Sequence, residues 1–423
     1  MLQITTIREN PQEVIERLSI KNFDAKELVE KVIFFDTQRR ETQKKLDDNL
    51  SEANSIAKEI GVLFKSGKSA EANALKERSA ELKTASKELS ELLQQIENKQ
   101  YNVLVLLPNL PHPSIPKGKG ADDNIVVAEE GVIPDLGKDI LAHWDLATKY
   151  DIIDFETGVK ITGSGFPVYK GKGARLQRAL INFFLDNAVA NGYVEVQPPF
   201  LVNENSAFGT GQLPDKEGQM YYIVEDNLYL IPTSEVPVTN IYRDIILKAE
   251  QLPVKNTAYS ACFRREAGSY GKDVRGLNRL HQFDKVEIVQ ITHPDKSYET
   301  LEEMKDYVCG LLRKLELPFR VVKLCGGDMS FASAFTYDLE VYAAAQQKWL
   351  EVSSVTNFET FQSNRLKLRF REGNGKPQPV HTLNGSALAL PRIVAALLEN
   401  NQTPVGIKIP KALVEYTGFE IIN

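Results

Sequence analysis

An arginine and a glutamate two residues apart, Arg264 and Glu266, are the first candidates for chemistry in this chain. They alternate along a predicted strand, so both side chains should point to one face of it. The guanidinium is a fork-shaped donor that suits phosphate oxygens, and the carboxylate beside it can accept a hydrogen bond from an amine. A triphosphate and an adenine amine would fit the pair, although an isolated R-x-E is more often a solvated hairpin with surface salt bridges.

The flanks of this pair predict two antiparallel strands joined by a long basic loop. Residues 259–263 and 283–289 are short, apolar or alternating, and contain Tyr, Phe, Val and Ile. The segment between them has too many glycines for a helix interior. Such a loop could clamp a polyanion, because it and its margins carry five cations: Arg264, Arg265, Lys272, Arg275 and Arg279.

Three shorter segments carry groups suited to a small charged substrate or to a metal. Residues 233–235, Thr-Ser-Glu, could hold an ammonium and a small polar side chain, but they also suit a helix N-terminus. Residues 351–354, Glu-Val-Ser-Ser, offer hard oxygen ligands for Mg²⁺ carried on phosphates, with a strand-end turn as the alternative. Residues 384–386 end a glycine-containing strand before an apolar helix, where Pro391 precedes Arg392.

Composition limits the class of protein. With 423 residues, 42% of them hydrophobic, the chain can form more than one domain. A net charge of −6 argues against wholesale coating of nucleic acid, although local basic patches can still contact RNA. The N-terminus lacks a secretory signal pattern and no stretch is long enough to cross a bilayer. A cytoplasmic protein without a membrane association is expected.

The cysteines predict neither a disulfide framework nor a zinc cluster. Cys262, Cys309 and Cys325 are an odd number and show no C-x-x-C spacing. Unpaired core thiols in a reducing cytosol are the favoured interpretation, and no zinc is expected.

The first hundred residues predict a long helical hairpin. In its second half an apolar residue recurs every seven positions, which is typical of a coiled coil: Leu75, Leu82, Leu89 and Ile96. Ser66-Gly67 predicts the turn, so each helix of ~35 residues would extend on the order of 50 Å. Heptads more commonly join two chains, but the turn favours self-pairing. The proline-rich residues 104–137 predict an irregular linker and a boundary near 105.

These segments together resemble class II aminoacyl-tRNA synthetases, and among them the seryl-tRNA synthetase family. Motif 2 matches over residues 263–287, FRREAGSYGKDVRGLNRLHQFDKVE. Residues 173–200 resemble motif 1, with Pro199 at its signature position, and residues 381–399 resemble motif 3. The resemblance covers nearly the whole chain, in order.

The resemblance implies an α+β architecture in two parts. Residues 1–104 would form the tRNA-binding arm, an antiparallel coiled-coil hairpin at about 27–99. Residues 105–423 would form the catalytic domain, built on a mixed, mainly antiparallel β-sheet flanked by helices. Motif 1 implies a homodimer, although core packing explains its helix and strand about equally well.

The resemblance also implies a serine–tRNA ligase. It would activate L-serine with ATP and Mg²⁺ to seryl-adenylate, release pyrophosphate, and transfer serine to the 3′ end of tRNA(Ser). The arm and the motif 2 loop would contact the tRNA, and tRNA(Sec) stays open as a second substrate. Glu287 would let the pocket select serine, because alanine would leave a buried acceptor unpaired.

Individual roles follow from the family's motifs. Arg264 and Arg392 would be the catalytic pair on the phosphates, Phe283 would stack on adenine, and Glu351 with Ser354 would hold Mg²⁺. ATP-binding residues are implied at Arg264, Arg265, Glu266, Phe283, Glu351, Val352, Ser353, Ser354 and Arg392. Serine-binding residues are implied at Thr233, Ser234, Glu235, Arg264, Glu287 and Ser386. The run FQSNR at 361–365 departs from the more usual FQARR, and we carry no site residue over from it.

Other classes remain as alternatives. A ligase that loads an amino acid onto a carrier protein could use the same catalytic body, but the long arm argues against it. A binding paralogue could keep the fold without the chemistry, but the intact R-x-E, E-x-S-S and Arg392 argue against that. A coiled-coil interaction protein would explain the first hundred residues only. An archaeal zinc-dependent serine enzyme would need a Cys/His cluster that the sequence lacks.

Overall fold

The structure is a computed structural model in which residues 1–215, 218–266 and 275–423 are described. The chain divides into two compact units. The first contains residues 1–19 and 23–110, and the second contains residues 20–22 and 111–423. Among the described residues, no helix is both long enough and apolar enough to span a membrane.

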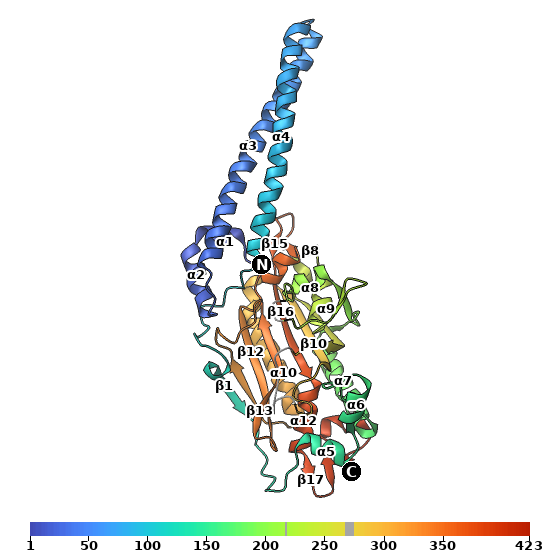
Figure 1. Ribbon diagram of the computed structural model, residues 1–423. Coiled ribbons are helices and arrows are strands. Elements are labelled where there is room, and N and C mark those ends of the chain that lie inside the picture. Colours follow the sequence, from blue (N-terminus) through green and yellow to red (C-terminus); the bar gives the residue numbers. More distant parts are fainter. Residues whose placement is uncertain (216–217, 267–274) are drawn as a thin grey trace. The chain divides into compact units, whose positions relative to one another are not determined.

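The first unit is a helical hairpin, as predicted. Two short helices, α1 (Ile4–Glu9) and α2 (Pro11–Ile20), precede the long pair α3 (Lys26–Lys65) and α4 (Ser69–Leu104) (Figure 1). The long helices pack side by side and bury one stripe each, which includes Val32 and Leu46 of α3 and Leu82 and Ile96 of α4. Their other faces stay exposed, because a heptad pattern supplies apolar side chains for one seam only.

The second unit is built on an eight-stranded sheet of order β1-β11-β12-β13-β16-β10-β9-β4. All neighbouring strands are antiparallel except β4 and β9, so the predicted mixed, mainly antiparallel sheet is confirmed. The strands are β1 (Ile125–Glu130), β4 (Val194–Glu195), β9 (Val254–Phe263), β10 (Gln282–Thr292), β11 (Phe319–Lys323), β12 (Phe335–Ala343), β13 (Lys348–Asn357) and β16 (His381–Ala389).

Helices pack against this sheet and form the main core with it. The three longest are α7 (Gly171–Ala190), α10 (Ser297–Lys314) and α12 (Leu390–Asn400) (Figure 1). α12 is apolar nearly all round and buried, which is typical of a helix enclosed by protein. Its Pro391 occupies the first turn, where a missing N–H costs little. The three cysteines are free and buried, as expected.

Smaller elements complete the second unit. Its short helices are α5 (His143–Lys149), α6 (Phe155–Ile161), α8 (Glu204–Thr210), α9 (Glu235–Asn240), α11 (Phe361–Arg365) and α13 (Lys411–Thr417). Its minor strands are β2 (Ile153–Asp154), β3 (Val168–Tyr169), β5 (Leu201–Asn203), β6 (Tyr222–Ile223), β7 (Leu228–Leu230), β8 (Ile246–Lys248), β14 (Arg369–Arg371), β15 (Gln378–Pro379), β17 (Gln402–Thr403), β18 (Gly406–Lys408) and β19 (Ile421–Ile422).

Two expectations about these elements need correction. Residues 104–137 are not irregular throughout, because they contain the edge strand β1. The Glu-Val-Ser-Ser segment lies inside β13, so it is not a turn at a strand end. The strands predicted at 259–263 and 283–289 are present, and both are longer than predicted.

Candidate active site

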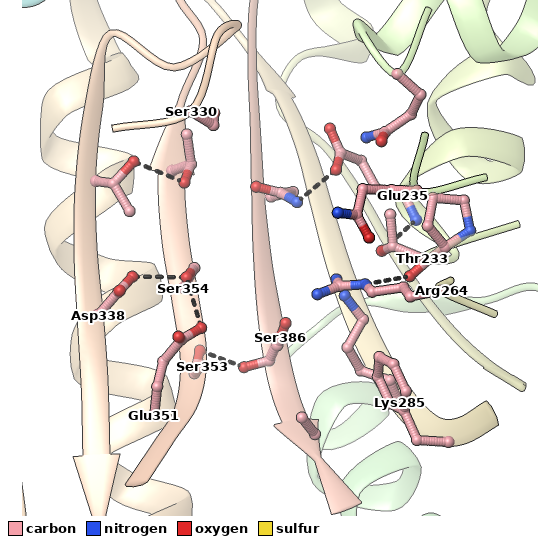
Figure 2. Close-up of a pocket in the computed structure, with 18 of the residues that line it drawn as sticks. Thr233, Glu235, Arg264, Lys285, Ser330, Asp338, Glu351, Ser353, Ser354 and Ser386 are labelled. Atoms are coloured by element: carbon pink, nitrogen blue, oxygen red, sulfur yellow. Dashed lines mark hydrogen bonds between the residues drawn. The ribbon is translucent and has the colours of Figure 1, made fainter. Parts of the chain in front are cut away.

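A cavity of about 710 Å³ opens over the middle of the sheet. Strands β10, β12, β13 and β16, the start of α12, the segment after β9 and the segment before α9 contribute to its lining. Figure 2 shows Arg264, Lys285, Glu235 and Thr233 on one side of this space and Asp338, Glu351 and Ser354 on the other. The cavity therefore has a cationic wall next to buried acids and a second, acidic wall across from it.

Arg264 and Glu266 both line the cavity, but strand alternation is not the reason. β9 ends at Phe263, and Glu266 has a φ of 48°, a left-handed conformation that no strand residue adopts. The prediction that both residues belong to one strand is therefore wrong. Glu266 instead meets Arg279 across the cavity mouth, with its Oε2 3.0 Å from Arg279 Nη1.

The guanidinium of Arg264 lies over an aromatic ring on the neighbouring strand. Its Cζ is 5.3 Å from the centroid of Phe283, which pairs with Cys262 across β9 and β10. Its Nε lies 3.4 Å from the carbonyl oxygen of Pro232. One face of Phe283 is thus covered by a cation, which the ring quadrupole favours. The remaining guanidinium donors are left to face the cavity (Figure 2).

The Thr-Ser-Glu segment divides its side chains between the cavity and the protein interior. Thr233 and Glu235 line the cavity. Ser234 does not, because its hydroxyl turns inward and lies 2.6 Å from the hydroxyl of Ser260. Burial, and then the negative charge of Glu287, raise the pKa of Glu235 to about 7.

Glu287 lies directly behind the cavity lining and is 1% exposed. Its carboxylate accepts hydrogen bonds from Asn384 at 2.9 Å and from Ser386 at 3.3 Å, and it pairs with Lys285 at 2.7 Å. Such a set of donors is what allows a carboxylate to stay buried. Three of these residues, Lys285, Asn384 and Ser386, line the cavity themselves.

The opposite wall carries the acidic group that was predicted for a metal. Ser354 donates to Asp338 at 2.6 Å and lies 3.3 Å from Glu351 Oε1. Burial, and then the charge of Glu351, raise the pKa of Asp338 well above its usual range. Val352 and Ser353 also line the cavity, and the Ser353 hydroxyl donates to the carbonyl of Ser386 at 2.6 Å.

These oxygens suit a hard divalent cation. A carboxylate and a hydroxyl next to a second acid match the ligands of Mg²⁺, which keeps waters and phosphate oxygens for its other positions. Within residues 1–215, 218–266 and 275–423, no group of three or more His, Cys, Asp and Glu side chains stands in a metal-binding arrangement. The acidic wall fits an ion that arrives with a phosphate ligand better than one held by the protein alone.

Arg392 contacts the main chain on both sides of the cavity, at Glu351 and at Asn278. From the first turn of α12 its Nη1 donates to the backbone carbonyl of Glu351 at 2.8 Å, and its Nε donates to the carbonyl of Asn278 at 3.0 Å. The side chain lines the cavity, and its Nη1 also lies 3.7 Å from Glu351 Oε2. It thus lies at the same cavity as Arg264, as predicted from sequence for two phosphate-binding cations.

Some predicted residues lie elsewhere, and some lining residues were missed. Arg265 is exposed, does not line the cavity, and lies over the ring of Tyr221 at 5.5 Å. Lys272, predicted in the loop, falls outside the described residues. The cavity is also lined by Asn278, Lys285, Asp338 and Asn384, which were not predicted from the sequence, and by Arg279, which was predicted as one of the cations of the basic loop. Lys285 could have been found, because it alternates with Phe283 and Glu287 along β10.

Known sequence families match both parts of this chain. A model of the tRNA synthetase class II core domain (G, H, P, S and T) matches residues 222–401. A model of the seryl-tRNA synthetase N-terminal domain matches residues 1–111. The chain is 52% identical to the serine–tRNA ligase of Salinibacter ruber and 47% identical to that of Chlorobium luteolum, in each case over 100% of this chain and 99% of the relative.

Solved structures give the same assignment. The fold is similar to a seryl-tRNA synthetase from Pyrococcus horikoshii complexed with ATP, with a TM-score of 0.94 and 34% identity over 100% of this chain and 99% of that one. A cytoplasmic serine–tRNA ligase from Naegleria fowleri in complex with AMP gives a TM-score of 0.89 and 28% identity, with the same coverage. The chain therefore belongs to the seryl-tRNA synthetase family of class II synthetases, and its activity is that of a serine–tRNA ligase, the ATP-dependent aminoacylation of tRNA(Ser).

Proposed function

We propose that the cavity over the sheet is where seryl-adenylate forms, with serine at the Glu235 and Glu287 end and ATP across the Arg264 and Arg392 end. One observation carries this assignment. Glu235, a buried carboxylate of the lining, lies on the same side of the cavity as the guanidinium of Arg264, with Glu287 directly behind the lining, so an ammonium and a phosphate can bind next to each other. An amino acid about to attack a nucleotide brings those two charges together.

The chemistry in this arrangement is in-line attack of the serine carboxylate on the α-phosphate, which breaks the bond to the β-phosphate and releases pyrophosphate. The carboxylate is already ionised at neutral pH, so no general base is needed. Arg264 would grip the α-phosphate and Arg392 the distal phosphates, so that charge building in the transition state is neutralised by groups already in position. Glu266 would accept a hydrogen bond from the adenine amine, and Phe283 would stack on the adenine ring.

The metal follows the phosphates. Glu351 and Ser354 would hold Mg²⁺ bound to ATP, and the ion would neutralise phosphate charge during the transfer. This role is supported by the carboxylate and hydroxyl oxygens of Glu351 and Ser354 on β13. Asp338, whose pKa is raised, lies next to them and accepts a hydrogen bond from Ser354.

Selection of serine would depend on its hydroxyl. Glu287 and Ser386 sit together at the deep end, where a hydroxyl hydrogen could be accepted. Alanine has no hydroxyl and would forfeit that hydrogen bond to a charged acceptor, which is worth about 1.5–3 kcal/mol. Thr233 and Glu235 would take the ammonium, and the position of Ser234 makes it a packing residue in this scheme.

The remaining partners are proposed on the family's pattern. Residues 1–104 would contact tRNA(Ser) through the exposed faces of the α3–α4 hairpin, together with the motif 2 loop, and residues 105–423 would catalyse both steps. A cytoplasmic location is part of this proposal. A homodimer formed through α7 and β4 is supported by apolar side chains that stay exposed there, such as Val189 and Val194. Charging of tRNA(Sec) would require its 3′ end to bind in the same way as that of tRNA(Ser). A separate aminoacylation assay with tRNA(Sec) would test it.

Pyrophosphate exchange tests the assignment. We expect ATP–pyrophosphate exchange with serine alone among the amino acids, and near-complete loss of exchange in Arg264→Ala and Glu287→Ala. Circular dichroism and thermal unfolding would show that both variants fold. Wild-type exchange in either variant would remove that residue from the site. Transfer of serine to a carrier protein, with none to tRNA, would support the carrier-ligase alternative.

A further inference from the structure

A buried histidine and glutamate outside the cavity form a hydrogen-bonded pair. His143 begins α5, Glu399 lies near the end of α12, and both side chains are 0% exposed. His143 Nδ1 lies 2.8 Å from Glu399 Oε1. The backbone N–H of Leu277 donates to His143 Nε2 at 2.9 Å. A backbone N–H can only donate, so Nε2 is the acceptor and Nδ1 carries the proton.

Glu399 ties three segments together through its two oxygens. Oε1 accepts from the backbone N–H of His143 at 3.1 Å and from Gln346 Nε2 at 2.9 Å. Oε2 accepts from the backbone N–H of Ala345 at 3.0 Å and of Gln346 at 3.2 Å. A buried charge with this many donors fixes the position of whatever supplies them. The start of α5 and the β12–β13 turn are thereby locked to α12.

Residues 277–279 connect this hydrogen-bonded network around Glu399 to the cavity. Leu277, Asn278 and Arg279 all line the cavity. The side chain of Asn278 donates to Gln346 Oε1 at 2.8 Å, and its backbone carbonyl accepts from Arg392 Nε at 3.0 Å. The main chain of Leu277 and Asn278 is thus fixed by His143 on one side and by Arg392 on the other. The Asn278 carbonyl that orients Arg392 is held in position by the hydrogen bonds around Glu399.

We propose that His143 is a positioning residue for ATP, acting through the backbone of Leu277 and Asn278 on the guanidinium of Arg392. This inference rests on the proposed role of Arg392 at the distal phosphates. His143 is not among the residues that line the cavity. Its contribution is to supply the acceptor that fixes the main chain, because a guanidinium held by one misplaced carbonyl would not be preorganised for phosphate.

The contacts around the ring indicate more than space filling. Gly276 has a φ of +66°, and a Cβ there would lie 2.3 Å from His143 Nε2, so the main chain approaches the ring as closely as a glycine permits. Arg275 lies over the ring of Trp144 at 4.6 Å. The first turn of α5 therefore contacts three consecutive residues, 275 to 277, just before they enter the cavity wall.

Two isosteric variants separate positioning from packing. His143→Gln can place an oxygen near the Nε2 position and keep an acceptor for Leu277, whereas His143→Asn keeps a donor near Glu399 but does not reach Leu277. In the full-length protein, we expect His143→Asn to raise the KM for ATP by about tenfold. The KM for serine should stay within about twofold, and His143→Gln should restore the KM for ATP. If the histidine were needed only for folding, its variants would lower the fraction of active enzyme and would not raise the KM for ATP selectively over the KM for serine.

Arg392→Ala separates this inference from the proposed function. If Arg392→Ala leaves the KM for ATP unchanged, the proposed role of Arg392 fails. If Arg392→Ala raises it while both His143 variants behave as wild type, the positioning role alone is overturned. The double variant Arg392→Ala, His143→Asn should be no worse than Arg392→Ala, because the histidine acts through the arginine.

A second perturbation covers the case in which the His143 variants do not fold. Gly276→Ala forces the ring and the main chain apart without removing the buried pair. We expect the same selective rise in the KM for ATP. An unchanged KM for ATP in folded Gly276→Ala, or an equal rise for ATP and serine, would contradict the proposal.

Discussion

Glu235 and Glu287 accept hydrogen bonds from one and the same amide, the Nδ2 of Asn384, at 2.9 Å each. Two buried carboxylates that close would repel each other if nothing lay between them. The amide bridges them, while Gln362 donates to Glu235 at 2.6 Å and Lys285 pairs with Glu287 at 2.7 Å. The bridge holds the acids at a fixed separation before any ligand arrives.

Loss of the bridge should weaken serine binding selectively. In Asn384→Ala each carboxylate loses a hydrogen bond, worth about 1.5–3 kcal/mol when the acceptor is charged, so the KM for serine should rise about tenfold or more. The KM for ATP should change little. Pyrophosphate exchange with each substrate varied in turn measures both, and Asn401→Ala, an amide outside the cavity, is the control. Equal changes in both constants would indicate a general disturbance instead.

The raised pKa of Glu235 predicts a pH dependence for serine binding. Its carboxyl is half protonated near pH 7, and only the ionised form attracts an ammonium, so serine binds more tightly as the pH rises through about 7. We expect kcat/KM for serine to fall as the pH is lowered from about 8 to about 6. Glu235→Gln should show a lower and flatter profile.

The control for this profile is Glu372→Gln, which removes an exposed acid that does not line the cavity. It should keep the wild-type pH dependence. A wild-type profile that is flat between pH 6 and 8 would exclude Glu235 as the titrating group. A slope retained in Glu235→Gln would assign the titration to another residue.

The helical hairpin could be predicted from sequence, and the sheet order could not. The seven-residue repeat and the Ser66-Gly67 turn are local signals, and α3 and α4 follow them. The order of the strands depends on pairing between residues far apart in the chain. Asn384 shows the consequence: its partner Glu287 is 97 positions away, and only the antiparallel register of β10 and β16 brings them together.

The errors within the site have similar causes. The alternation rule placed Glu266 on β9, but nothing in the local pattern marks Phe263 as the last strand residue. Which of Thr233, Ser234 and Glu235 faces the cavity depends on where α9 begins and on Ser260 of the adjacent strand, which captures the Ser234 hydroxyl. Residue types could be read from motifs, whereas side-chain directions depended on tertiary packing.

Weakening the acidic wall should raise the need for magnesium. Glu351→Gln removes the exposed carboxylate beside Ser354, so the Mg²⁺ concentration for half-maximal exchange should rise about tenfold, with the KM for serine unchanged. Glu340→Gln is a matched control, because Glu340 pairs with Glu351 across β12 and β13 but does not line the cavity. An unchanged magnesium requirement in Glu351→Gln would take this residue out of the metal site.

Removal of the hairpin should separate the two steps of the reaction. The cavity residues all come from the second unit, which has its own core, so deletion of residues 30–98 with a short linker should leave pyrophosphate exchange within about twofold of wild type. The rate of tRNA(Ser) charging should fall about 100-fold, because contacts to the phosphate backbone supply much of the affinity for nucleic acid. Raising the tRNA concentration should restore part of the rate, since the deletion acts on binding. Full charging by the deletion variant at low tRNA concentration would show that the hairpin does not bind the substrate.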